Sequence, residues 1–328
     1  RWRPHAFLVA GPIVSVTVLS LVGMAWTPAT LAGVLVIGGL GGAAFHPTAA
    51  AVVHRQGGSR RGLAMAIHIT GGSIGYAVGP LLFAPYVGRF GLTSTPLLAL
   101  PGLALLALVL RGMPLMRPLA SGSGGGYLAL RPFAKPLFLL WLIVVLRTMT
   151  SLSIATFVPV LLTTRGWSVG MAGVAVSVYL AAGGLGGFAG GPLADRLGPK
   201  RVIAGSLVLA APLLAAATRL TDWPLVAVLA LGGFFLQSTL PVNVTFAHQI
   251  APTGAATVSS LMLGFAWGTG GLMAPIVGAA ADRIGIGTTL TAVAFLPLLA
   301  AACSMPLPSG AKTESAVRRP DERALGRV

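Results

Sequence analysis

Long apolar runs recur along the whole of this 328-residue sequence. A helix needs about 20 apolar residues to cross a bilayer, so runs of roughly that length are typical of membrane spans. Only 9% of the residues are charged, whereas an average soluble domain has about 25%. The sequence therefore predicts an all-α polytopic membrane protein with ten spans, near residues 6–26, 30–53, 62–87, 94–111, 136–161, 168–191, 202–218, 222–248, 255–280 and 286–306.

The basic residues fall unevenly on the two sides of these spans. The sequence has 22 Lys and Arg residues and a formal net charge of +16. Seventeen of them lie on one side, four lie on the other, and Arg147 lies within a span. Because positively charged loops stay in the cytoplasm, we expect both termini there, in a multi-pass protein of the plasma (inner) membrane. This distribution accounts for the basicity without a nucleic-acid partner.

The chain repeats itself at an offset of 194 residues. His54 coincides with His248 at this offset and Pro47 with Pro241, as do several glycines. Paired halves of this kind are typical of transporter folds. Two spans of the second half have no counterpart in the first, so we expect a chain that is N-terminally truncated and lacks two helices of a twelve-helix parent.

The expected organisation is two six-helix bundles, with about ten of the twelve transmembrane helices present. A Gly/Ser tract, SGSGGG, marks a flexible connection between them. The expected parts are four helices of an N-terminal bundle, a cytoplasmic linker, a C-terminal six-helix bundle and a cytoplasmic tail, at 1–111, 112–135, 136–306 and 307–328.

A short charged stretch, GGPLADRLGPKR, separates two of the apolar runs. It resembles the loop motif G-x-x-x-D-[RK]-x-G-x-[RK] of the major facilitator superfamily, at Gly191, Asp195, Arg196, Gly198, Lys200 and Arg201. The resemblance implies that Asp195 acts as a conformational latch, paired in one of two access states. The alternative is a loop whose cations only keep it in the cytoplasm.

Three longer segments, at 43–53, 60–82 and 146–162, are similar to fosmidomycin-resistance-type drug exporters. This resemblance implies a secondary transporter that exports a small drug-like or anionic compound by alternating access, against a flow of protons. Part of the antiporter motif of such exporters is also matched. We expect its residues to allow close helix packing, namely Gly71, Gly72, Gly75, Gly79 and Pro80.

One charge lies in the middle of an apolar run. Arg147 follows Pro136, the start of its span, by 11 residues, and an arginine at such a depth costs roughly 2.5–3.5 kcal/mol. It must face a cavity or a partner. We therefore expect Arg147 to anchor an anionic or polar substrate, with Gln237, Asn243 and Thr156 as further binding residues. A structural arginine bonded to backbone carbonyls is the alternative.

Proton coupling needs a titratable group within the membrane, and no Asp or Glu lies mid-span in this sequence. His46 and His68 are the candidates, because an imidazole with an unperturbed pKa of about 6.5 exchanges protons near neutrality. The alternative for each is a buried neutral histidine with local hydrogen bonds.

Signatures of other chemistries are missing from the sequence. It has no Walker phosphate loop, no nucleophile-elbow or zincin motif, and a single cysteine, Cys303. We expect no enzymatic activity, no cofactor and no metal. The expected partners are a small-molecule substrate, protons and the lipid bilayer, and we expect a monomer. Metabolite uptake by symport, a non-transporting sensor or scaffold, and an inactive fragment are the alternatives.

Overall fold

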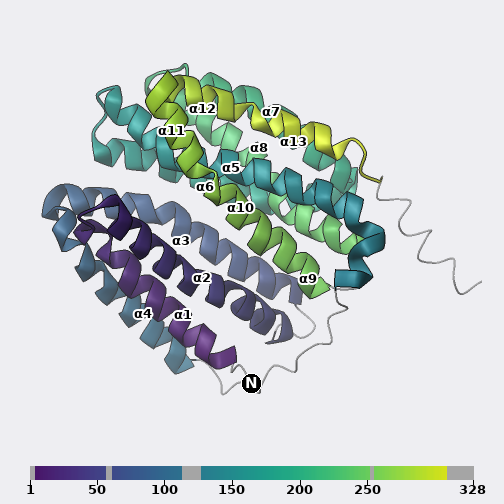
Figure 1. Ribbon diagram of the computed structural model, residues 1–328, viewed down its shortest axis with the longest axis horizontal. Helices are drawn as coiled ribbons and strands as arrows, with labels where there is room; N and C mark the ends of the chain where they lie inside the picture. The colour runs from purple at the N-terminus through teal and green to yellow at the C-terminus, as the bar shows by residue number, and fades with distance from the viewer. Residues whose placement is uncertain (1–3, 57–60, 113–126, 252–254, 309–328) are drawn as a thin grey trace, which may run out of the picture. The chain divides into compact units, whose positions relative to one another are not determined.

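A computed structural model describes residues 4–56, 61–112, 127–251 and 255–308, and within these ranges the chain is helical without β-strands (Figure 1). Nine helical segments of this part are long and apolar enough to cross a membrane. Helix α3 (Arg61–Phe90) occupies the place of the remaining expected span, 62–87. The prediction of an all-α polytopic protein is confirmed.

The chain divides into two compact units. The first comprises residues 1–72 and 81–122, and the second comprises residues 73–80 and 123–328. Most of the predicted linker, 113–126, lies outside the described residues, as does the predicted tail from residue 309 onward. The proposed boundaries of the four parts therefore stay predictions.

The first unit is built on two helices that lie side by side, α1 (Pro4–Leu19) and α2 (Pro28–Gln56). They approach closely at a pair of glycines, since a Cβ on Gly41 would lie 2.5 Å from the carbonyl oxygen of Gly11. The Ser15 hydroxyl of α1 donates a hydrogen bond to Gly38 O of α2 at 2.7 Å. The other elements are η1 (Ser20–Met24), η3 (Leu92–Leu98), α4 (Ala99–Gly112) and most of α3.

The second unit contains a continuous core of buried aliphatic residues. Its long helices are α5 (Ala134–Thr164), α6 (Val169–Leu197), α7 (Pro199–Ala217) and α8 (Asp222–Ile250), with η4 (Tyr127–Phe133) ahead of them. Shorter pieces follow, namely α9 (Ala255–Ser259), η5 (Ser260–Phe265), α10 (Ala266–Leu272), α11 (Ala274–Ile284), α12 (Ile286–Ala294) and α13 (Leu296–Ser304). Segment η5 is a π-helical turn, a form that is frequent at functional sites.

Helices α6 and α8 pack closely because glycines line α6 where the two meet. A Cβ on Gly186 would lie 2.0 Å from Phe234 O, and one on Gly190 would lie 1.9 Å from Ser238 O. No side chain fits at such distances, so the two backbones touch directly. This contact fixes the relation between the α6 and α8 side chains that face α5.

The 194-residue repeat is visible in the backbone of both units. Gly91 ends α3 with φ of 77° and donates to Val87 O at 2.8 Å. Gly285, at the same place in the repeat, ends α11 with φ of 84° and donates to Ala281 O at 3.0 Å. Glycine suits both turns because it adopts positive φ without steric cost. The two halves therefore share local structure as well as residue identities.

Candidate functional site

Arg147 lies in the interior of the second unit, on α5, with 1% of its surface exposed. One guanidinium nitrogen, Nη1, donates to Gln237 Oε1 of α8, and the other, Nη2, donates to Thr148 Oγ1 at 3.0 Å. The guanidinium carbon lies 5.5 Å from the ring centroid of Trp267 on α10, within cation–π range. Three helices thus bring their side chains to one buried cation.

No carboxylate neutralises this cation within the described part of the chain. The acidic residues there are Asp195, Asp222 and Asp282, which are all exposed and lie at or near helix ends. In addition, Arg147 Nε is buried without a hydrogen-bond partner. A guanidinium has five N–H donors, so donors are left for a further acceptor. An uncompensated buried charge is costly, which makes this position a candidate for binding an anion.

A chain of hydrogen bonds continues from Arg147 across three helices. Gln237 Nε2 of α8 donates to Ser151 Oγ of α5 at 3.3 Å. The Tyr179 hydroxyl of α6 donates to the same Ser151 oxygen at 3.4 Å. Tyr179 and Ser151 are buried. Ser151 was not among the expected site residues, although it lies four positions after Arg147 and hence on the same helix face.

Two of the predicted binding residues lie apart from this cluster. Asn243 is fully buried on α8, and neither its oxygen nor its nitrogen has a hydrogen-bond partner. Thr156 is exposed on α5, nine residues after Arg147. The structure therefore brings Gln237, but neither Asn243 nor Thr156, into hydrogen-bond contact with Arg147. The binding roles of these two residues stay predictions.

The two proton-coupling candidates belong to the first unit. His46 is exposed on α2, where its ring lies 5.6 Å from the Phe45 ring, and His68 is partly buried on α3. The structure thus places both candidates in one unit, and their role in coupling stays a prediction.

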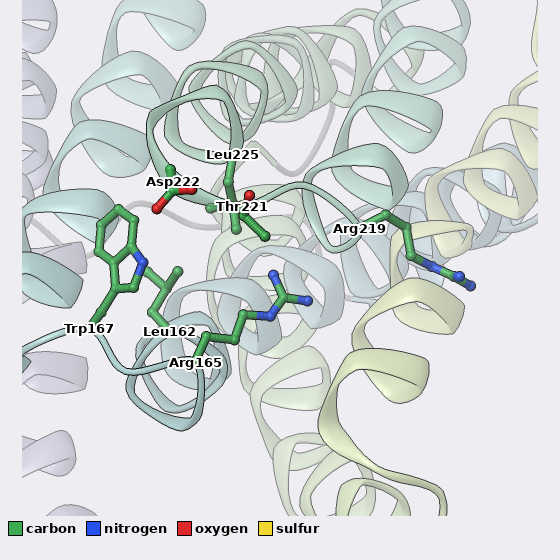
Figure 2. Close-up of a pocket in the computed structure, with 7 residues that line it drawn as sticks. All are labelled: Leu162, Arg165, Trp167, Arg219, Thr221, Asp222 and Leu225. Atoms are coloured by element: carbon green, nitrogen blue, oxygen red, sulfur yellow. The ribbon is translucent and has the colours of Figure 1, made fainter.

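A pocket of about 400 Å³ lies at the connections between α5 and α6 and between α7 and α8 (Figure 2). Arg165 lines it and donates to two backbone carbonyls at the end of α7, Thr218 O at 2.6 Å and Leu220 O at 2.8 Å. In Figure 2 the Arg219 side chain points away from Asp222 and the rest of the lining. The arginine that faces the pocket therefore serves to cap a helix.

Comparison with known proteins agrees with this architecture. Residues 139–323 match the model of the Major Facilitator Superfamily. The chain belongs to the Major Facilitator Superfamily. The superfamily consists of membrane transporters, so the chain is a multi-pass membrane protein of a transporter family, and the resemblance to this superfamily is confirmed.

Two curated relatives show the same membership. The uncharacterized MFS-type transporter YfnC of Bacillus subtilis (strain 168) is 32% identical over an alignment of 314 residues, which covers 91% of this chain and 76% of that protein. The fosmidomycin resistance protein of Escherichia coli (strain K12) is 31% identical over an alignment of 271 residues, which covers 80% of this chain and 66% of that protein. The resemblance to fosmidomycin-resistance-type proteins is thereby confirmed at the level of sequence.

Solved structures of transporters share the fold. A bacterial homolog of the human lysosomal transporter Spinster superposes with a TM-score of 0.69 at 15% identity, covering 95% of this chain and 84% of that one. The E. coli fucose:proton symporter FucP superposes with a TM-score of 0.60 at 16% identity, covering 92% and 83%. At these identities the likeness concerns the fold alone.

The loop motif of the superfamily lies between α6 and α7. Asp195 and Arg196 are exposed in the last turn of α6, and Gly198 makes the turn with φ of 87°. Lys200 Nζ donates to Leu307 O at 2.9 Å and to Met305 O, so it caps the end of α13. Asp195 has neither a hydrogen bond nor an ion pair with the described residues, and its role as a latch stays a prediction.

The antiporter-like glycines of α3 make no close contacts in the described structure. A Cβ on Gly71, Gly72, Gly75 or Gly79 would meet no atom within 4 Å. Close approach is instead made by glycines of α6 that sequence analysis did not single out. Their spacing in the sequence, GGLGGFAGG at 183–191, was the available signal.

Proposed function

We propose that this superfamily member is a secondary active transporter that exports a small anionic or drug-like compound, with protons as the coupling ion. One observation carries the substrate part of the proposal. Arg147 is a buried cation with neutral hydrogen-bond partners and an unbonded Nε, and none of the described carboxylates pairs with it. An anionic group that reached this guanidinium would supply the missing charge and accept its free N–H donors.

Export against protons is supported by sequence kinship and by the available titratable groups. The E. coli relative is named for resistance to fosmidomycin, which is consistent with outward transport of that drug. His46 and His68 both belong to the first unit and are proposed to exchange the coupling proton. We further propose a plasma-membrane location with both termini in the cytoplasm, on the basis of the charge distribution.

The decisive experiment is transport by the purified protein in proteoliposomes with an imposed pH gradient. Fosmidomycin serves as the probe, because it is the compound in the name of a relative that is 31% identical. We expect fosmidomycin movement opposite to the proton flow, and loss of that movement when a protonophore collapses the gradient. Movement in the same direction as protons would identify a symporter. Transport that ignores the gradient would overturn proton coupling.

The loop motif is proposed to control the rate of conformational exchange. Asp195 is exposed and unpaired among the described residues, so it is available to pair with a cation in another state. Asp195→Asn is expected to slow fosmidomycin transport severalfold while the order of preference among competing anions stays the same. A changed preference at an unchanged rate would contradict the latch.

A further inference from the structure

The interior of the second unit holds more polar side chains than anion binding by Arg147 alone requires. Ser151 and Tyr179 are both buried, and neither contacts the guanidinium through a hydrogen bond. They instead form the far end of the chain that starts at Arg147 and passes through Gln237. Any effect of Ser151 and Tyr179 on Arg147 must therefore pass through Gln237.

The side-chain amide of Gln237 has a donor end and an acceptor end. The residues around it are compatible with only one orientation of the amide. Arginine carries no acceptor, so only the amide oxygen can face Arg147. The amide nitrogen is then directed to Ser151 Oγ, the acceptor that it bonds at 3.3 Å. Without that acceptor, an N–H of this half-buried amide would be left unpaired, at a cost that favours another rotamer.

Tyr179 holds the acceptor in place. Its hydroxyl donates to Ser151 Oγ at 3.4 Å, so the serine oxygen receives hydrogen bonds from both α6 and α8. Packing supports the same arrangement. A Cβ on Gly183 would lie 2.8 Å from Gln237 Cγ, and a Cβ on Gly233 would lie 2.6 Å from Tyr179 Cδ2. Each polar side chain thus lies over a glycine of the facing helix, and little space is left for other rotamers.

We propose that Ser151 and Tyr179 are positioning residues that hold the amide oxygen of Gln237 toward Arg147 and so set the affinity of the anion site. This inference rests on the proposed function. Because the effect passes along a chain, loss of Ser151, which bonds Gln237 directly, has a larger effect than loss of the Tyr179 hydroxyl. Both losses act on substrate affinity rather than on the maximal rate.

The first test measures fosmidomycin transport in proteoliposomes by Ser151→Ala, Tyr179→Phe and the double variant. One interhelical hydrogen bond in a membrane protein is worth about threefold on average, and the strongest reach more than tenfold. We expect the KM to rise about tenfold for Ser151→Ala and about threefold for Tyr179→Phe, with the maximal rate within about twofold of the original protein. The double variant should resemble Ser151→Ala, because both changes break one chain.

Two other serines supply matched controls. Ser153 of α5 and Ser177 of α6 are also buried, but their hydroxyls have no hydrogen-bond partner. Ser153→Ala and Ser177→Ala remove the same atom from the same helices and are expected to leave the KM unchanged. Equal effects of all four single changes, or a fall in maximal rate at constant KM, would overturn the positioning role.

A second readout separates this inference from the proposed function. Phenylglyoxal modifies arginine side chains, and mass spectrometry of the peptide containing Arg147 gives its rate of modification without any transported compound. We expect Ser151→Ala and Tyr179→Phe to raise that rate at least about threefold over the controls, because a displaced Gln237 frees a guanidinium nitrogen. If the original protein does not transport fosmidomycin but the labelling rates differ in this way, the proposed substrate fails and the positioning role stands. Identical labelling rates would overturn the positioning role.

Discussion

Arg147, inside α5, and Arg165, directly after the last residue of α5, show how position decides the use of one residue type. Arg147 is 1% exposed, bonds two side chains and keeps an unbonded Nε. Arg165 is exposed and donates to two backbone carbonyls of the α7 end. Arg147 has N–H donors left for a ligand, whereas Arg165 uses its guanidinium to cap a helix. Burial together with incomplete hydrogen bonding therefore distinguishes the arginine that is proposed to bind an anion from the arginine that caps a helix.

Replacement of Arg147 and of Arg165 by alanine should give the largest difference in transport between these two regions. Loss of a buried, hydrogen-bonded charge from a binding site costs roughly 2–5 kcal/mol, so Arg147→Ala should lower fosmidomycin transport by about 30-fold or more. Arg165→Ala should leave transport within about twofold. Proteoliposome assays at matched protein amounts check both. Full transport and normal affinity in Arg147→Ala would show that the two arginines do not differ in function, and would contradict the proposed anion site.

Substitution of a glycine near each arginine should change the KM in one region and the stability in the other. Ala at position 183 would place a Cβ 2.8 Å from Gln237 Cγ and displace the partner of Arg147, so Gly183→Ala should raise the KM about tenfold. Gly166, next to Arg165, has free space around it but a φ of 87°. Gly166→Ala should therefore cost about 1–2 kcal/mol of stability and leave the KM unchanged. A changed KM in Gly166→Ala would show that a substitution beside Arg165 also affects substrate binding, contrary to expectation.

Aromatic side chains near the two arginines should also differ, with a smaller effect. The Trp267 ring lies 5.5 Å from the Arg147 guanidinium carbon. The Trp223 ring instead lies 6.1 Å from the ring of Trp167, which lines the pocket beside Arg165. Cation–π contacts are worth about 0.5–2 kcal/mol, so Trp267→Leu should raise the KM about fivefold. Trp223→Leu should not alter it. Equal KM values for the two variants would show that the contact with Arg147 does not affect binding.

The smallest expected effect concerns stability at the end of α5. Arg165→Ala removes two hydrogen bonds to carbonyls that the α7 helix leaves free, which should lower the free energy of unfolding by about 1 kcal/mol. Unfolding by titration with SDS in mixed micelles measures this change. Arg165→Lys, which keeps the charge, is the control and should recover part of the loss. No loss in the alanine variant would contradict the capping role.

Most of the fold could be predicted from hydropathy, because a bilayer requires each spanning segment to be long and apolar. The spans, the buried arginine and the 194-residue repeat are properties of the chain order, and the matching turns at Gly91 and Gly285 follow from it. The loop motif likewise placed its turn at Gly198. In these cases the relevant neighbours are close in sequence or the environment is uniform, so no knowledge of packing is needed.

The composition of the site depended on packing between helices that are distant in sequence. Arg147 and Gln237 meet only because α5 and α8 face each other, and Ser151 receives hydrogen bonds from Gln237 and from Tyr179 of α6. The glycines of α6, rather than those predicted on α3, make the close contacts that permit this. Sequence alone thus determined that a charge lies in the membrane. Which neutral partners surround it, and which of its donors are left unbonded, was decided by the tertiary structure, because hydrogen bonds depend on distances that chain order does not specify.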